Sequence, residues 1–257
     1  MYIPTMSDEF AAFILGLSEN FTALSGLGAD GPGFHNSIYR GISLGTSVTA
    51  AQYAAISAGT FKDLYIGDYW TINNTKYLIA AFDYYYDVGD TALKTHHVTL
   101  VPKGRLYIHA MNDTNTTEGG YLGSLMYGAG LNAAKTTIKA DFSGHVLTLR
   151  RYLSNTVTGG QASAGEWVDS DVELMNEAMV YGTVVNGAAT YGYYNIGTEK
   201  SQLPLFRLRH DLISFRSTWW LRDVCSSSYF AHVASRGIAA RDNASSDYGV
   251  RPAFSIS

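Results

Sequence analysis

Two short runs near the C-terminal end constrain the fold of this chain most strongly, because they bracket a stretch of different composition. The first run is Trp219-Trp-Leu-Arg-Asp223, and the second is Tyr248-Gly-Val-Arg-Pro-Ala-Phe254. Adjacent Trp residues on a strand place one ring in the core and the other on the opposite face. The second run is typical of a closing strand, which Pro252 restricts to an edge or to irregular pairing. Together the runs predict a rigid frame of strands.

The stretch between the runs, residues 225–247, predicts a ligand-binding loop. Its side chains are mostly small and polar, with a few aromatic ones, and they show no core pattern. Tyr provides contact area at a low entropic cost, while Ser, Asn and Asp provide adaptable hydrogen bonds. Catalysis would instead require a few charged groups fixed in a pocket. The alternative, an ordinary surface loop, stays open.

The predicted binding residues combine hydroxyl, amide, charged and aromatic side chains. They are Ser226, Ser227, Ser228, Tyr229, Phe230, His232, Ser235, Arg236, Arg241, Asp242, Asn243, Ser245, Ser246, Asp247 and Tyr248. We expect Tyr229, Phe230 and Tyr248 to stack on a ligand and the polar side chains to hydrogen-bond to it. No catalytic residue, cofactor or metal is predicted for this site.

The composition favours a β-rich particle or surface protein. Only 16% of the 257 residues are charged, whereas Gly and Tyr are abundant, at 26 and 19 residues. The net charge is −4 and the basic residues do not cluster, which argues against nucleic-acid binding through a basic patch. The single cysteine, Cys225, excludes an intramolecular disulfide framework and a Cys-based zinc site.

Residues 1–40 are predicted to form an attachment or oligomerisation segment, because they are too few to enclose a core alone. Residues 7–17 read as a short amphipathic helix, and a Gly-rich breaker follows over residues 25–33. The start lacks the basic region of a signal peptide, and the apolar stretch Phe10–Leu17 is too short to span a bilayer. We therefore expect synthesis in a host cytoplasm without membrane insertion.

Residues 41–257 are predicted to form one α+β domain with short strands, two or three helices and long loops. The predicted helices cover residues 49–58, 120–140 and 169–179, and the predicted strands cover 64–72, 76–83, 97–101, 105–110 and 146–149. Asn73-Asn74 marks a hairpin turn between two of these strands. In the last helix, Val172, Met175 and Met179 would face the core.

Several strings of catalytic appearance lack the context that their chemistry needs. Gly41-Ile-Ser-Leu-Gly45 fits a nucleophile elbow, but no buried strand precedes it and no helix follows it directly. His96-His97 would point to opposite faces of a strand. The carboxylates over residues 83–90 read as a hairpin end rather than a calcium loop. Glu173 and Glu177, one helical turn apart, keep a glycan hydrolase open as an alternative.

The order of these motifs resembles a family of C-type-lectin-like domains that is common in bacteriophage structural proteins. The resemblance is strongest in the two framing runs and covers roughly residues 40–257. Earlier strings that fit the family are Ile66-Gly-Asp-Tyr-Trp-Thr-Ile, Phe82-Asp, Asp169-Ser-Asp-Val-Glu-Leu-Met and Lys200-Ser-Gln-Leu-Pro-Leu-Phe. The resemblance implies a compact lectin-like fold with a small hydrophobic platform and long loops.

The resemblance also implies a place on the phage particle, in a head fibre, a tail fibre or a decoration, and binding to host-surface glycans or proteins. In some related proteins a dedicated retroelement diversifies the C-terminal loop, and the composition of residues 226–247 fits such a loop. The chain lacks the Glu-Pro-Asn, Gln-Pro-Asp and Trp-Asn-Asp motifs of calcium-dependent sugar-binding lectins. The related formylglycine-generating enzymes need a cysteine pair or copper-binding thiols, and a lone Cys225 does not supply either.

The leading hypothesis is therefore a non-enzymatic virion protein that displays a receptor-binding loop. A homotrimer is expected, since fibres and decorations follow particle symmetry and weak contacts gain from avidity. Residues 1–40 would contact a capsid or tail protein. One alternative is a purely structural decorating or connector protein, and a second is the hydrolase that uses Glu173 and Glu177.

Overall fold

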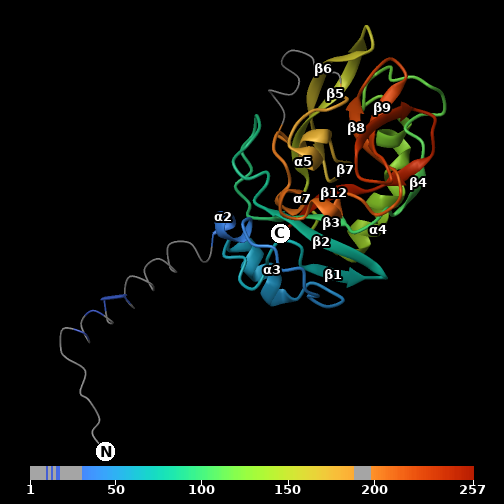
Figure 1. The fold of residues 1–257 in the computed structure, drawn as a ribbon. Coiled ribbons are helices and arrows are strands. Elements are labelled where there is room, and N and C mark those ends of the chain that lie inside the picture. The colour runs from blue at the N-terminus through green and yellow to red at the C-terminus, as the bar shows by residue number, and fades with distance from the viewer. Residues whose placement is uncertain (1–9, 11–12, 14–15, 18–30, 188–197) are drawn as a thin grey trace, which may run out of the picture.

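The computed structural model describes residues 10, 13, 16, 17, 31–187 and 198–257, and it has a mixed α+β architecture made mostly of strands (Figure 1). The predicted α+β class is confirmed. Five short α-helices lie within the described residues, rather than the two or three expected. They are α2 (Pro32–His35), α3 (Ala50–Ser57), α4 (Asn132–Asp141), α5 (Glu177–Tyr181) and α7 (Pro204–Leu208).

The first sheet has five strands and joins the early part of the domain to the end of the chain. Its order is β1 (Tyr69–Ile72), β2 (Thr75–Phe82), β3 (Val98–Pro102), β12 (Pro252–Ile256) and β7 (Val172–Leu174). The predicted hairpin is confirmed: β1 and β2 meet at Asn73-Asn74, whose positive φ angles of 45° and 66° suit a tight hairpin turn. Pro252 pairs with β7 only, and pairing with β3 begins at Phe254. The closing strand is thus central in the sheet, with the irregular pairing that Pro252 predicts.

The second sheet contains the predicted frame and the stretch between its two runs. Its order is β10 (Ala239–Asn243), β9 (Tyr229–Val233), β8 (Trp219–Val224), β11 (Tyr248–Val250) and β4 (Tyr107–His109). Strands β8 and β11 lie parallel, with Gly249 opposite Trp219. The frame runs are therefore neighbours in space, and the stretch between them forms the outer strands β9 and β10 on the other side of β8.

A long hairpin of β5 (Leu149–Thr158) and β6 (Gln161–Ser170) projects from the upper end of the body in Figure 1. The chain reverses at Gly159-Gly160, where both φ angles are positive, at 59° and 80°. Glycine adopts this conformation without steric penalty. The expected strand at 146–149 is wrong in extent, because Val146 forms only an isolated bridge to Ile256 and β5 begins at Leu149.

The predicted helices have mixed outcomes. The helix at 49–58 is confirmed as α3, and Thr49 and Gln52 form a capping box at its start. The helix expected at 120–140 begins later, because a π-helical turn, Met126–Gly130, precedes α4. The helix expected at 169–179 is wrong. β6 and β7 take up its first half, and α5 starts only after Asn176, whose side chain accepts a hydrogen bond from the N–H of Met179.

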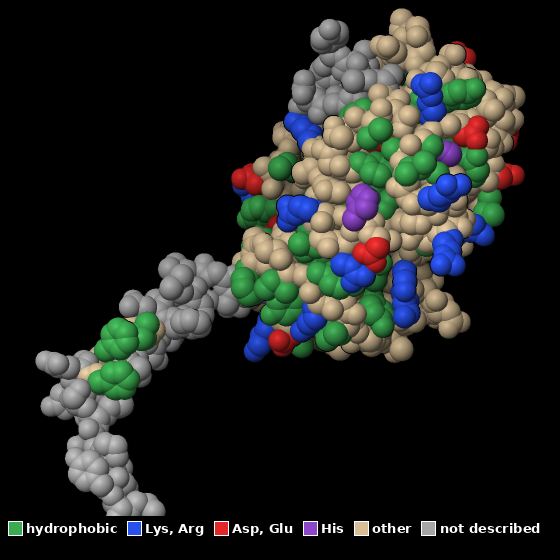
Figure 2. Space-filling model, viewed as in Figure 1, with side chains coloured by type: hydrophobic (Ala, Val, Ile, Leu, Met, Phe, Trp, Pro, Cys, Tyr) green, Lys and Arg blue, Asp and Glu red, His purple; other side chains and the backbone are tan. Residues whose placement is uncertain are grey.

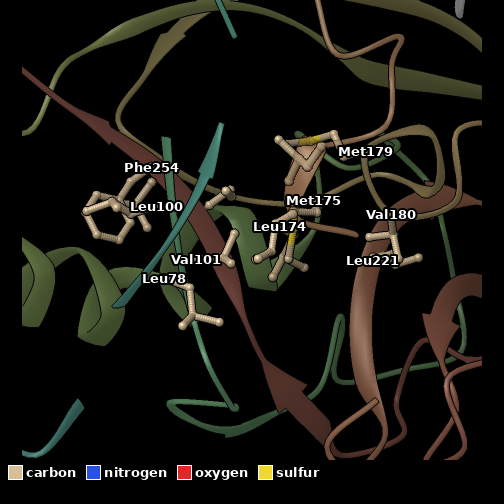
Figure 3. Close-up of a cluster of buried hydrophobic side chains, with 14 of the residues drawn as sticks. Leu78, Leu100, Val101, Leu174, Met175, Met179, Val180, Leu221 and Phe254 are labelled. Atoms are coloured by element: carbon tan, nitrogen blue, oxygen red, sulfur yellow. The ribbon is translucent and has the colours of Figure 1, made fainter. Parts of the chain in front are cut away.

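The core lies between the first sheet, α5 and β8 (Figure 3). The residues that Figure 3 labels come from β2, β3, β7, β8, β12, α5 and the residue after β7: Leu78, Leu100, Val101, Leu174, Met175, Met179, Val180, Leu221 and Phe254. Each is 5% exposed or less. Val172, Met175 and Met179 are buried as predicted, although they lie on β7, directly after β7 and on α5 rather than on one helix. Burial of such side chains supplies most of the stabilisation of a domain of this size.

The frame is more deeply buried than expected, since both faces of β8 are covered. Trp219 and Trp220 are both fully buried, and their indole N–H groups donate to the carbonyls of Ile213 and His109, respectively. The guanidinium of Arg251 lies 4.9 Å from the ring centre of Trp219, and its Nε donates to the carbonyl of Pro102 at 2.9 Å. Arg251 thus ties the frame to the first sheet by hydrogen bonding and a cation–π contact.

Helix α2, which lies within residues 1–40, packs against the domain predicted at 41–257. His35 is buried, and its Nδ1 lies 2.6 Å from the carbonyl oxygen of Leu64. The side chain of Asn36 bonds both the N–H and the carbonyl of Phe82. The helix predicted at 7–17 and the breaker at 25–33 fall largely outside the described residues. No helix in the described part is long and apolar enough to cross a membrane.

Candidate functional site

The stretch predicted as an irregular loop forms a β-hairpin on the edge of the second sheet. Strands β9 and β10 pair antiparallel from Tyr229–Asn243 to Val233–Ala239. A turn closes the hairpin, with the N–H of Ala234 donating to the carbonyl of Ile238 at 2.9 Å. The loop prediction is wrong because Phe230, Ala231 and Val233 supply buried side chains that a short strand needs.

Most predicted binding residues reach the surface of this hairpin and its flanks. The exposed ones are Ser227, Ser235, Arg236, Arg241, Ser245 and Asp247. Half-buried are Ser226, Ser228, Tyr229, Asp242, Asn243, Ser246 and Tyr248. These side chains define the candidate recognition surface. The face seen in Figure 2 carries Lys and Arg side chains spread among Asp, Glu and uncharged ones, without one large basic patch.

Phe230 and His232 belong to the interior rather than to this surface. Phe230 is fully buried, so stacking of its ring on a ligand, as the sequence suggested, is excluded in this fold. His232 is 7% exposed and lies opposite Trp220 on the neighbouring strand. Both residues stabilise the platform beneath the candidate recognition surface.

A group of aromatic and acidic side chains joins this surface to the platform. The ring of Tyr248 lies 4.8 Å from that of Trp220 and 4.9 Å from that of His232, measured between ring centres. The hydroxyl of Tyr248 donates to the carboxylate of Asp242. Burial, followed by the contact with Asp242, raises the pKa of Tyr248 to about 12. Tyr248 is therefore a neutral donor that fixes β11 to β10, and its ring is only partly available to a ligand.

A cleft of about 750 Å³ opens beside the candidate recognition surface. Three segments line it: residues 116–118, residues 157–161 at the end of the β5–β6 hairpin, and residues 225–227. We call it the hairpin cleft. The sequence predicted Ser226 and Ser227 as binding residues, but it did not predict the segments that form the other two walls. The Gly159-Gly160 pair was the available signal, since a double glycine between polar β-forming residues favours a hairpin turn.

Glu173 and Glu177, the carboxylates of the hydrolase alternative, lie on different elements. Glu173 is on β7, is fully buried and accepts a hydrogen bond from the hydroxyl of Tyr121 at 2.6 Å. Burial raises the pKa of Glu173 above its usual value. Glu177 is also fully buried and accepts the backbone N–H groups of Val185 and Gly187. Both carboxylates hold backbone and side-chain groups in place, and neither faces the hairpin cleft.

Of the other strings of catalytic appearance, His96-His97 has both of its rings near Asp83, contrary to the expected opposite faces. Asp83 bonds His96 Nδ1 at 2.7 Å, and His97 is buried with its Nε2 accepting the N–H of Tyr85. Asp87 pairs with a lysine and Asp90 with an arginine, so the carboxylates of 83–90 do not converge. Among the residues that the structure describes, no group of three or more His, Cys, Asp or Glu side chains could hold a metal ion.

The C-terminal part of the chain is similar to one family of proteins. Residues 162–257 match the family model described as Domain of unknown function (DUF6273). This range starts within β6 and includes every strand from β7 to β12, and therefore the frame and the candidate recognition surface. No curated protein and no solved structure matches the chain.

Proposed function

We propose that this chain is a bacteriophage virion protein, displayed on a head fibre, a tail fibre or a decoration, that binds a glycan or protein on the host surface. The observation that carries the proposal is the contrast between frame and hairpin. Strands β8 and β12 are buried along their whole length, whereas the β9–β10 edge presents exposed Ser, Arg and Asp side chains. A rigid base with adaptable polar groups at its edge is the composition of a binding surface.

The C-type-lectin-like fold is part of the same proposal. Short strands in two sheets, short helices and long connections support it, as does the return of β12 into the centre of the first sheet. The order of the framing runs along the chain supports the phage context. In this proposal residues 1–40 contact a capsid or tail protein, and three copies assemble on the particle.

The test is adhesion of the fluorescently labelled full chain to bacterial cells. A triple variant, Arg236→Ser, Arg241→Ser and Asp247→Asn, removes exposed charges from the candidate recognition surface. We expect it to lose adhesion while keeping the thermal unfolding midpoint of the wild type, because these side chains contribute little to the core.

The matched control carries Lys62→Ser, Lys103→Ser and Asp63→Asn, which change the net charge equally at exposed positions outside the β9–β10 hairpin. This control should adhere as the wild type does. Equal adhesion of the triple variant and the control would refute the surface assignment. A wild-type protein that adheres to no candidate host would instead favour the structural decorating role.

A further inference from the structure

We infer that the hairpin cleft binds a short oligosaccharide that is uncharged or carries an amine. This inference rests on the proposed function, and it specifies both the place of binding and the sugar chemistry. With a volume of about 750 Å³, the cleft falls within the range of about 300–1,000 Å³ that small-molecule sites occupy. It lies next to the candidate recognition surface, with which it shares Ser226 and Ser227.

The walls of the cleft are held together before any ligand arrives. The buried Thr117 donates its N–H to the carbonyl of Ser227 at 3.0 Å and its hydroxyl to the carbonyl of Ser226 at 2.7 Å. Gly160 closes the opposite side, because a Cβ at this position would lie 3.0 Å from the backbone nitrogen of Ser227. A site fixed by backbone contacts loses little conformational entropy when a ligand binds.

The cleft offers polar groups that no described part of the protein uses. The side chains of Glu118, Gln161 and Ser227 line the cleft, are exposed, and make no hydrogen bond within the described ranges. Together they provide an amide donor, a hydroxyl that can donate or accept, and carboxylate and amide acceptors. The hydroxyl groups of a sugar are both donors and acceptors, so they complement this mixture. Val157 adds an apolar patch for the C–H face of a sugar ring.

The charge of the lining selects among sugars. Glu118 is the charged side chain among the described lining residues, and Lys, Arg and His are missing from that set. A phosphate or carboxylate on the ligand would face Glu118 with no cation in the lining to pair with, which is electrostatically unfavourable. An amine would gain a charge-assisted hydrogen bond from the same carboxylate. Neutral and amine-bearing sugars are therefore accepted, and polyphosphate glycans are rejected.

The experiment measures binding of the labelled full chain to printed oligosaccharides and, in parallel, to host cells. The panel contains a neutral N-acetylglucosamine trimer, its deacetylated amine-bearing counterpart, a glycerol phosphate oligomer, and other neutral and anionic sugars. Ser227→Trp fills the cleft, whereas Ser47→Trp adds the same bulk at an exposed position outside both the hairpin cleft and the candidate recognition surface. Unfolding midpoints confirm that both variants fold.

We expect wild type and Ser47→Trp to bind neutral or amine-bearing sugars, and Ser227→Trp to bind them about tenfold more weakly or not at all. Undiminished sugar binding by Ser227→Trp, a preference for the anionic sugars, or adhesion to cells without binding to any printed sugar would overturn the inference and leave the proposed function standing. A protein that adheres to neither cells nor sugars would overturn both.

Discussion

At the scale of single residues, His232 was predicted to bind a ligand, but its side chain packs in the interior. It lies on β9 with its ring against Tyr248 and near Trp220, and neither ring nitrogen has a hydrogen-bond partner within the described structure. Burial disfavours the charged imidazolium and lowers the pKa of His232 to about 4, although Asp242 acts in the opposite direction. At neutral pH the ring is therefore an uncharged packing group.

This burial predicts a pH-dependent stability. The pKa of about 4 in the folded state lies below the value of about 6.5 expected in the unfolded chain, so the unfolded chain binds more protons between these values. The contribution of His232 to the free energy of unfolding is complete above about pH 6.5 and falls by up to about 3 kcal/mol as the pH drops to about 4. Urea unfolding at several pH values measures this loss.

The comparison uses His232→Phe, which keeps a ring of similar shape without a titratable group. This variant should lose less stability than the wild type over the same pH range. His210→Phe, a change of an exposed histidine, should follow the wild type. Parallel curves for wild type and His232→Phe would contradict the assignment.

At the scale of elements, the sequence predicted turns and helix caps correctly, but it did not always distinguish a helix from a strand. Thr49 and Asn73-Asn74 act through contacts with their near neighbours, and both elements that they mark are confirmed. The 169–179 segment contains apolar residues whose spacing fits a helical face, yet the first of them pairs as part of β7 with β12, about 80 residues away in the sequence. Long-range pairing of this kind leaves no local signal.

Glu177 gives a prediction at this scale, because its carboxylate connects α5 to the turn that follows. It accepts the N–H groups of Val185, Asn186 and Gly187 at 2.7 to 3.0 Å. Glu177→Gln removes the negative charge and replaces one acceptor oxygen with an NH₂ group, so we expect a loss of about 2 kcal/mol in the free energy of unfolding. Chemical denaturation monitored by Trp fluorescence provides the measurement.

Glu166→Gln serves as the control, since Glu166 is exposed on β6. It should change the free energy of unfolding by less than about 0.5 kcal/mol. If both variants unfold at the same denaturant concentration as the wild type, the structural role given to Glu177 is wrong.

At the scale of the whole molecule, the candidate recognition surface was partly predictable and the hairpin cleft was not. The Ser, Asn and Asp residues between the two framing runs indicated the polar edge. The burial of Phe230 could not be predicted, because it depends on the pairing of β9 with β8 and β10. Two cleft walls, near Thr117 and Ser226, are 109 residues apart in the chain. Their contact is a product of the tertiary fold, which one sequence does not display.

The proposed trimer makes a prediction at the same scale. Phe10, Phe13 and Leu17 have helical backbone and are 51%, 61% and 49% exposed, with the spacing of one helical face. An exposed apolar stripe of this kind favours association with other copies. We expect the full chain to sediment as a trimer, and the variant Phe10→Ser, Phe13→Ser, Leu17→Ser to sediment as a monomer with the same unfolding midpoint. A trimeric variant would place the assembly contacts elsewhere.

The parallel neighbours β8 and β11 also bear on how such a protein can change. Because β8 and β11 lie side by side while β9 and β10 form the outer edge of the same sheet, the exposed residues of 225–247 could be exchanged without moving either framing strand. New polar residues, or a turn of different length between β9 and β10, would leave β8 and β11 in place. Phe230, Val233 and Ala244 would have to stay apolar in such a change, since they are buried in the core beneath the surface. Related proteins could thus change their binding partner through substitutions at the edge of the sheet while keeping the same fold.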